Sequence, residues 1–386
     1  MKIAIIGMGY VGIPLAYNLS KNFEIIGYDI DKNKINELKS GNDCIGEYTK
    51  KEINESSIKF TYDSDEIKNA EVFIVCVPTP ISMDKKPNLS HLESATRLIS
   101  KKMNKNSLVI YESTVYPGLT EEFCGKIIEE AGFKLNKNYY LGYSPERVNP
   151  GDKINKIDKI VKLISCSDSN KLDLMEKIYG SFTKTYRVDS IKIAEASKAI
   201  ENAQRDINIA FMNELKHLFK KTDLDFNKIL SAAKTKWNFL NFYPGLVGGH
   251  CIPVDPYYLA EYAKLNNFKT ELILSGRKIN DEMYLNYKKY IKNKIKEEKL
   301  ILLGLTFKEN VNDFRSSQAI KLAKALNSEY EIKCYDPYAS EAFYLSNGLS
   351  KASESELSDE KIPKIILVNH SKLLNKFKNT ILLNEL

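Results

Sequence analysis

The chain has 386 residues, a net charge of +7 and 43% hydrophobic residues, which excludes a disordered chain and predicts two or three domains. No apolar run is long enough to span a bilayer, and the apolar start passes directly into a glycine turn, so neither a membrane span nor a signal peptide is expected. The six cysteines are scattered, with no CxxC pair, which is typical of reduced thiols in a cytoplasm. The four histidines do not cluster with cysteines at metal spacing, and the positive charges lie in mixed Lys/Glu helices, so neither a metal site nor nucleic-acid binding is predicted.

The first half of the chain alternates strand-like and helix-like segments. The predicted strands are 2–6, 24–28, 59–62, 72–77, 108–112 and 139–143, with two more at 159–164 and 184–188. Amphipathic stretches of helical length lie between most of them, notably 90–102 and 117–131. This alternation predicts a doubly wound, parallel sheet of the Rossmann type.

A glycine-rich turn follows the first strand. It reads Gly7-Met-Gly9-Tyr10-Val11-Gly12 and opens a helix. Glycines there allow the backbone to approach a pyrophosphate, which the helix N-terminus then faces. Asp29 ends the next strand, at the spacing expected of an acid that binds a ribose, and favours NAD over NADP, although Lys34 is close enough to weaken that preference.

The pattern then becomes helical from Ile191 to about Lys221. One face of this segment is apolar, with Ala196, Ile200, Ala203, Ile207 and Phe211. The opposite face carries Glu195, Lys198, Asn202 and Arg205. Such a helix suits a spine between two domains or a surface that pairs with a second copy. More helix is predicted at 226–234 and 256–265.

The last region repeats the order of the first. A strand ends at Gly304, a helix starts near Ser316, and the strand 331–335 is followed by Asp336. This order predicts a second, degenerate nucleotide-binding unit of Rossmann-like fold, although strand–Gly–helix–strand is common in α/β proteins. The predicted domains are therefore 1–190 for NAD binding, 191–295 for a central helical part, and 296–386 for a second ligand.

Cys251 lies behind two glycines and four residues before Asp255. An alcohol that has lost one hydride is an aldehyde, which a thiol can trap so that a second hydride can leave. A nucleotide turn together with such a cysteine therefore predicts the oxidation of an alcohol to a carboxylate. Most cysteines are buried and inert, and Cys44, Cys76, Cys124 and Cys334 fit that description. Asp255 also reads as a helix cap followed by proline.

Other polar residues have two readings. Lys198, Asn202 and Arg205 share a helical face, as a catalytic set or a solvated stripe would. Other candidates follow predicted strands or lie in the loop after Gly304, where ligand sites and ordinary turns both occur: Thr79, Thr114, Glu146, Arg147, Lys308 and Arg315.

Taken in order, these segments resemble the UDP-glucose/GDP-mannose dehydrogenase family, from Met1 to about Tyr338. The resemblance rests on the glycine turn and on seven further motifs. They are Val77-Pro-Thr-Pro80, Glu112-Ser-Thr-Val-Tyr-Pro-Gly118, Ser144-Pro-Glu-Arg147, Lys198-Ala-Ile-Glu-Asn202, Gly248-Gly-His-Cys-Ile-Pro-Val-Asp255, Gly304-Leu-Thr-Phe-Lys308 and Asn312-Asp-Phe-Arg315.

The resemblance implies a role for each candidate residue. Cys251 would be the nucleophile, supported by Lys198, Asn202, Asp255, Thr114 and Glu146 around the oxyanion and a water molecule. NAD would contact Gly7, Gly9, Tyr10, Val11, Gly12, Asp29, Lys34, Thr79, Thr114 and Arg315. The UDP-sugar would contact Glu146, Arg147, Lys198, Asn202, Arg205, Tyr243, Gly245, Gly248 and Lys308. The resemblance also implies that 191–295 is the dimerisation and catalytic domain of a homodimer and that 296–386 is the UDP-sugar-binding domain. A role in bacterial surface polysaccharide synthesis is implied as well.

Within this family, His250 before the cysteine and Pro-Val-Asp255 after it resemble the branch that acts on UDP-N-acetylhexosamines. The implied reaction converts the C6 hydroxymethyl to a uronate with two NAD, through a thiohemiacetal and a thioester on Cys251. Three alternatives remain: a UDP-glucose 6-dehydrogenase, a single-step β-hydroxyacid dehydrogenase, and a non-catalytic NAD-binding sensor. The motifs leave the gluco or galacto configuration of the sugar open.

Overall fold

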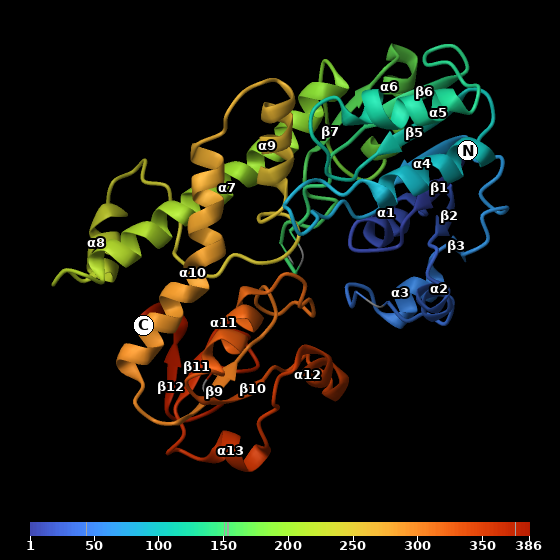
Figure 1. Ribbon diagram of the computed structural model, residues 1–386. Helices are drawn as coiled ribbons and strands as arrows, with labels where there is room; N and C mark the ends of the chain where they lie inside the picture. Colours follow the sequence, from blue (N-terminus) through green and yellow to red (C-terminus); the bar gives the residue numbers. More distant parts are fainter. Residues whose placement is uncertain (44, 150, 153, 375) are drawn as a thin grey trace. The chain divides into compact units, whose positions relative to one another are not determined.

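The computed structural model describes residues 1–43, 45–149, 151–152, 154–374 and 376–386, so the predicted context of Cys44 lies outside the described residues. The chain divides into two compact units (Figure 1). The first unit is Met1–Glu201 with Tyr257–Phe268, and the second is Asn202–Pro256 with Lys269–Leu386. The three-part division predicted from the sequence, with boundaries at 190 and 295, stays a prediction.

An eight-stranded sheet forms the centre of the first unit, in the order β3-β2-β1-β4-β5-β6-β7-β8. Its strands are β1 Lys2–Ile6, β2 Glu24–Tyr28, β3 Ile58–Thr61, β4 Val72–Val75, β5 Ser107–Tyr111, β6 Tyr139–Tyr143, β7 Lys162–Cys166 and β8 Thr185–Arg187. All neighbours run parallel except β6 and β7, which are antiparallel. The prediction of a parallel, doubly wound sheet is thus confirmed, with one reversed pair.

Helices cover both faces of this sheet. They are α1 Gly12–Leu19, α2 Lys32–Lys39, α3 Lys50–Glu55, α4 Ser90–Lys102, the π-helix η1 Thr120–Gly125, α5 Lys126–Glu130 and α6 Ser169–Gly180. One core joins α4, η1 and α5 to the sheet, and the other joins α1, α2, α3 and α6 to it. The central strands β4 and β5 are buried on both faces, which explains their nearly continuous apolar sequences.

The second unit contains a four-stranded parallel sheet in the order β10-β9-β11-β12. Its strands are β9 Lys299–Leu303, β10 Glu331–Tyr335, β11 Lys364–Ile366 and β12 Thr380–Leu382. The later helices are α8 Phe226–Ala233, α10 Leu272–Lys294, α11 Gln318–Leu326, α12 Glu341–Asn347, α13 Glu354–Ser358 and the 3-10 helix η2 Leu383–Glu385. Buried side chains of α10 and α11 pack on this sheet, which confirms the predicted Rossmann-like last region.

Helix α7, Ile191–Phe219, is continuous over 29 residues, and α9 spans Asp255–Leu265. The polar face of α7 contains buried side chains, since Glu195 and Lys198 are 0% and 7% exposed. Its apolar face is more exposed, with Ile200 at 55% and Phe211 at 54%. In a single chain this helix therefore buries charged groups and leaves large apolar side chains in contact with water. No helix in the described ranges is both long and apolar enough to cross a membrane.

Candidate functional site

The glycine turn after β1 has the geometry that the sequence predicts. Gly7 has a φ of +100°, and its N–H donates to the carbonyl of Tyr28 at 2.8 Å. A Cβ on Gly12 would lie 1.9 Å from the carbonyl oxygen of Gly7, so only glycine allows α1 to start so close to β1. A Cβ on Gly9 would have no atom within 4 Å, so the bare backbone there faces open space. Tyr10 and Val11, also predicted to contact NAD, complete the turn before α1.

Asp29 organises the same turn from the end of β2. One oxygen of its carboxylate accepts a hydrogen bond from the N–H of Met8 at 2.9 Å. The same oxygen forms an ion pair with Lys34 Nζ at 2.8 Å. Asp29 is 8% exposed, at the position where an acid can bind the ribose of a dinucleotide. The turn therefore fits NAD, with a helix N-terminus for the pyrophosphate and an acid for the ribose.

The loops after β4 and β5 contain Thr79 and Thr114, which are both partly buried. Ser113 Oγ donates to the carbonyl of Val77 at 2.7 Å and so joins the two loops. The Tyr258 hydroxyl donates to the carbonyl of Thr79 at 3.1 Å. These hydrogen bonds thus hold the loops that contain Thr79 and Thr114 at one edge of the sheet.

Glu195 on α7 fixes the far end of the Thr114 loop. Its carboxylate accepts hydrogen bonds from the N–H groups of Gly118 at 2.5 Å and Thr120 at 2.9 Å. Burial raises the pKa of Glu195 to about 7, although these hydrogen bonds lower it. The sequence gives no signal for this contact, because Glu195 is recognisable there only as part of a polar helical face.

A buried charge cluster lies behind Glu146, after β6. Lys162 Nζ is 2.5 Å from a carboxylate oxygen of Glu112 and 3.7 Å from one of Glu146. The Tyr179 hydroxyl donates to Glu112 at 2.6 Å. Burial raises the pKa of Glu112, whereas the neighbouring Lys162 lowers it. The other oxygen of Glu146 accepts from the backbone N–H groups of residues 147 and 148, so the carboxylate has a defined orientation.

Arg147 and Arg205, both predicted to contact the substrate, have different surroundings. The Arg147 guanidinium forms an ion pair with Glu201 at 2.7 Å and donates to the carbonyl of Val161 at 2.9 Å. Arg205 is exposed on α7. The Arg147 guanidinium thus binds groups of its own unit. These contacts indicate a structural role at least as strongly as a role in binding the substrate.

Cys251 lies in the second unit, four residues before the first residue of α9. It is partly buried, and its carbonyl accepts hydrogen bonds from the N–H groups of Val254 at 3.1 Å and Asp255 at 2.9 Å. Asp255 is fully buried, and Asn202 Nδ2 donates to its carboxylate at 2.5 Å. These contacts fix the backbone of Cys251 in the turn that leads into α9, and the Asn202 amide holds Asp255 in the same unit. Asp255 is itself the first helical residue, one position later than a cap would be.

Other cysteines have surroundings unlike those of Cys251. Cys76, Cys124 and Cys334 are buried, and burial raises the pKa of each thiol, to about 12 for Cys124 and Cys334. Cys166 is partly buried in β7, where burial raises its pKa to about 11. Such thiols are poor nucleophiles near neutral pH, as predicted for three of them.

Lys308 and two of the predicted glycines line one pocket of about 440 Å³ in the second unit. The other lining residues include Glu309, Asn369 and Asn384. Asn213 of α7 binds both backbone groups of Gly245, at 2.8 Å to its N–H and 3.0 Å to its carbonyl. A Cβ on Gly248 would lie 3.0 Å from Phe307, so glycine permits the two loops to approach. The predicted substrate residues Gly245, Gly248 and Lys308 therefore converge.

Tyr243 and Arg315 are not among the residues that line this 440 Å³ pocket. Tyr243 is 57% exposed, and its hydroxyl accepts a hydrogen bond from Lys234 at 2.8 Å. Arg315, predicted to contact NAD, pairs with Asp313 through two nitrogens and lies 3.4 Å from His250 Nε2. No group of three or more His, Cys, Asp or Glu side chains suited to a metal occurs among the residues that the structure describes.

Three models of one protein family match this chain in succession. The NAD binding domain of the UDP-glucose/GDP-mannose dehydrogenase family matches residues 1–183, its central domain residues 192–282, and its UDP binding domain residues 301–381. The chain belongs to the UDP-glucose/GDP-mannose dehydrogenase family.

Relatives in this family support the assignment along nearly the whole chain. A UDP-N-acetyl-D-glucosamine 6-dehydrogenase of Salmonella typhi is 44% identical, over 88% of this chain and 82% of the relative. Protein CapL of Staphylococcus aureus is 43% identical, over 84% of this chain and 79% of its own length. The solved structure of a UDP-D-ManNAc dehydrogenase from Pyrococcus horikoshii has a TM-score of 0.87 at 30% identity, covering 97% of this chain and 91% of that one.

Membership of the UDP-glucose/GDP-mannose dehydrogenase family confirms three predictions. The chain is an NAD-dependent dehydrogenase of a UDP-sugar, its first part binds NAD, and its last part is a UDP-sugar-binding domain. The open backbone at Gly9 and the acid at Asp29 fit that cofactor. The roles of the individual site residues stay predictions.

Proposed function

We propose that this enzyme oxidises the C6 hydroxymethyl group of a UDP-N-acetylhexosamine to a carboxylate, through a covalent intermediate on Cys251. The single observation that carries the proposal is the partly buried Cys251 in the turn before α9, whose carbonyl accepts a hydrogen bond from the N–H of Asp255, the acid that Asn202 holds. A one-step dehydrogenase would need no thiol there. The names of relatives at 43–44% identity support the N-acetylated substrate, since two of them are UDP-N-acetyl-D-glucosamine 6-dehydrogenases.

NAD, when bound, would accept the hydride that leaves C6 in each of two oxidations, and in the first oxidation the hydroxyl proton is released to water. After the first, the Cys251 sulfur adds to the aldehyde carbon, and the proton goes to the oxygen of the resulting thiohemiacetal. The second hydride leaves with the loss of that proton, which gives a thioester. Water then attacks the thioester carbon, the C–S bond breaks, and the uronate is released with the thiol restored.

Asn202 and Asp255 are proposed to stabilise the oxygen of these intermediates and to position the water. An amide nitrogen carries two N–H donors, and Asp255 accepts one from Asn202. The second donor can serve an oxyanion, where a single donor is worth about 3 kcal/mol. Lys198, buried one turn earlier on α7, is proposed to supply a positive charge for the same oxygen. Thr114 and the oriented carboxylate of Glu146 are proposed to hold the water.

Substitution of Cys251 by serine tests the covalent step. We expect Cys251→Ser to release no uronate above about a thousandth of the wild-type rate while NAD binding, measured by titration, stays unchanged. Cys166→Ser is the matched control, because this cysteine is also partly buried but lies within β7. A Cys251→Ser enzyme with native turnover would contradict the proposal.

The number of NADH formed per sugar separates the alternatives. Our proposal predicts two, and a β-hydroxyacid type of enzyme predicts one. Rates on UDP-N-acetyl-D-glucosamine, UDP-N-acetyl-D-galactosamine and UDP-glucose then separate the substrates. A preference for UDP-glucose would overturn the N-acetyl assignment, and NAD binding without turnover on any of them would favour a sensor.

We propose further that α7 forms a homodimer interface. Four of its large apolar residues, Ile193, Ile200, Phe211 and Leu218, are 50–55% exposed in the single chain. Their spacings of 7, 11 and 7 residues place them on one helical face. We expect the double variant Ile200→Glu/Phe211→Glu to be monomeric by light scattering. The control is Leu345→Glu on α12, which is 81% exposed and should leave the mass unchanged.

A further inference from the structure

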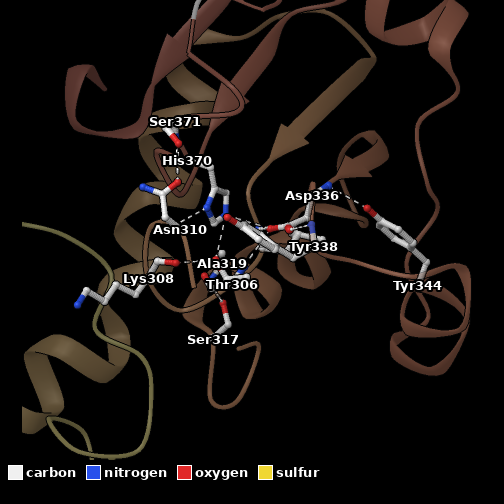
Figure 2. Close-up of polar contacts among 11 residues, drawn as sticks. Thr306, Lys308, Asn310, Ser317, Ala319, Asp336, Tyr338, Tyr344, His370 and Ser371 are labelled. Carbon is white, nitrogen blue, oxygen red and sulfur yellow. Dashed lines mark hydrogen bonds and ion pairs between the residues drawn. The ribbon is translucent and has the colours of Figure 1, made fainter. Parts of the chain in front are cut away.

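A buried histidine lies beneath the loop that carries Lys308. His370 follows β11 and is 0% exposed, and it contacts Thr306, Asn310 and Asp336 (Figure 2). The sequence motifs give His370 no role, and the proposed chemistry does not use it. Its contacts nevertheless join the end of β11 to the segment 306–310 in the same unit.

The hydrogen bonds of His370 define its protonation state. The backbone N–H of Asn310 donates to Nδ1 at 2.8 Å, so Nδ1 carries no proton. The proton is therefore on Nε2, which lies 3.0 Å from Thr306 Oγ1 and 3.3 Å from a carboxylate oxygen of Asp336. Thr306 Oγ1 donates its own proton to the carbonyl of Lys308 at 2.8 Å and so can accept from the histidine. The geometry thus requires a neutral imidazole.

This arrangement is not a nucleophilic triad. In such a triad the acid and the hydroxyl contact opposite ring nitrogens. Here Thr306 and Asp336 share Nε2, and the Thr306 side chain is fully buried. The network therefore cannot relay a proton to a substrate. What it can do is fix the conformation of the segment 306–310.

The loop that His370 holds forms part of the wall of the 440 Å³ pocket, through Thr306, Phe307, Lys308 and Glu309. Asn310 has a φ of +58°, which is uncommon for a residue with a side chain. Its Oδ1 accepts hydrogen bonds from the N–H of Ser371 at 3.0 Å and from its hydroxyl at 2.9 Å. In Figure 2 the side chain of Lys308 extends away from the histidine.

We propose that His370 is a positioning residue for substrate binding: as the neutral Nε2–H tautomer, it holds the segment 306–310 in the conformation that presents Lys308 to the diphosphate of the nucleotide. This inference rests on the proposed function, because it takes the pocket beside Lys308 to receive the UDP part of the substrate. Asp336 and Thr306 orient the imidazole, and Asn310 is the residue through which the imidazole acts on the loop.

Two substitutions separate the two sides of the ring. In His370→Gln the amide nitrogen can replace Nε2 and still donate to Thr306 and Asp336, but nothing replaces Nδ1. In His370→Asn the amide oxygen can replace Nδ1 and still accept from Asn310, but the contacts of Nε2 are lost. Both variants remove the same ring, so a general loss of packing affects both.

The experiment measures the Kd of UDP by calorimetry on the full-length enzyme, together with steady-state kinetics. We expect His370→Gln to raise the Kd of UDP and the KM of the UDP-sugar about tenfold, because a loop hydrogen bond is lost. The kcat and the KM of NAD should change less than about twofold. His370→Asn should retain UDP affinity within about threefold of the wild type.

Tyr344→Phe is the control for stability. The Tyr344 hydroxyl accepts a hydrogen bond from the N–H of Asp336 at 2.9 Å, on the side of the network away from the loop. This variant should lower the melting temperature and leave UDP binding unchanged. The inference is wrong if His370→Gln binds UDP as the wild type does, or if Tyr344→Phe loses as much affinity. A wild-type enzyme that does not bind UDP would instead overturn the proposed function, and this inference with it.

Discussion

The turns after β1 and β9 have almost the same backbone geometry in two different units. Gly7 and Gly304 have φ values of +100° and +83°. Their N–H groups donate to the last residue of the neighbouring strand, at 2.8 Å to Tyr28 and 2.9 Å to Tyr335. In each unit an L side chain at the glycine would be strained, so the resemblance between the two regions extends to the atomic contacts of the turn.

The acid after the second strand is also shared. Asp29 accepts a hydrogen bond from the N–H of Met8 at 2.9 Å, and Asp336 accepts one from the N–H of Leu305 at 2.5 Å. The partners of the acids differ. Asp29 pairs with the partly exposed Lys34, whereas Asp336 is 2% exposed and lies against His370.

The position two residues after the glycine separates the units most clearly. Gly9 leaves open space above the first turn, whereas its counterpart Thr306 fills the second turn with a buried side chain. One fold element thus has two uses. The first turn leaves its backbone bare for a pyrophosphate, and the second uses its own side chains to build a loop that faces a pocket.

The largest expected effect concerns two almost fully buried lysines, Lys162 in the first unit and Lys364 in the second. Lys162→Met should cost about 3–5 kcal/mol of stability, because Glu112 and Glu146 then remain buried without their cation. Lys364→Met in β11 should cost less, since Lys364 Nζ donates to neutral backbone carbonyls, those of residues 359 and 362. Urea unfolding measures both. Equal losses would show that the charge cluster of the first unit has no special energetic weight.

The two units should respond to pH in opposite directions. The folded protein keeps a proton on Glu195 between its ordinary pKa of 4.5 and about 7, where the unfolded chain has lost it. This contribution to the free energy of unfolding is fully present below pH 4.5 and is lost as the pH rises through 7. The total loss is about 3 kcal/mol. Glu195→Gln should flatten this part of a stability curve measured from pH 5 to 8.

Asp336 supplies the opposite sign. Burial alone would raise its pKa, but the hydrogen bonds from His370 and from the N–H of Leu305 lower it overall. The stability that it provides is therefore present above pH 3.8 and is lost as the pH falls further. A wild-type curve that rises steadily from pH 5 to 8 would contradict the assignment for Glu195.

Substitution of the two matching acids, Asp336 and Asp29, should affect different properties of the enzyme. Asp336→Asn should cost about 2 kcal/mol of stability, because a fully buried carboxylate loses its contacts with His370 and with backbone N–H groups. Asp29→Asn should cost less than about 1 kcal/mol. Its main effect should be weaker NAD binding and a smaller preference over NADP. The measurements are thermal unfolding and cofactor titration, and a larger loss of stability for Asp29→Asn would reverse our interpretation.

The smallest effect on stability is expected at Gly9. Gly9→Ala should change stability by less than about 0.5 kcal/mol, because the added methyl group meets no atom of the fold. The methyl group would occupy the space for the pyrophosphate, so we expect NAD affinity to fall about tenfold. Gly12→Ala is the contrasting variant, since its methyl group would collide with the carbonyl of Gly7 and should destabilise the unit itself. Unchanged NAD affinity in Gly9→Ala would contradict the proposed cofactor position.

Local sequence patterns accounted for most of the secondary structure. The strands β1, β2 and β6 and the helix α4 have the predicted bounds, because apolar runs between turn residues and a clear helical period are local signals. The interior of the region 117–131 was harder to predict, since a π-helix, Thr120–Gly125, and a short α-helix replace one continuous helix. Nothing in a pattern of apolar residues distinguishes these two geometries.

The order of strands and helices, the glycine turns and the acid after each second strand could be predicted from the sequence, because each depends on neighbouring residues and on backbone conformation. The burial of charged groups could not be predicted in this way, because it depends on contacts between distant segments. Glu112 meets Lys162 fifty positions later, and Asp336 meets His370 thirty-four positions later. Such contacts arise when separate strands end at the same edge of a sheet, and no periodicity along the chain records which side chains will meet there.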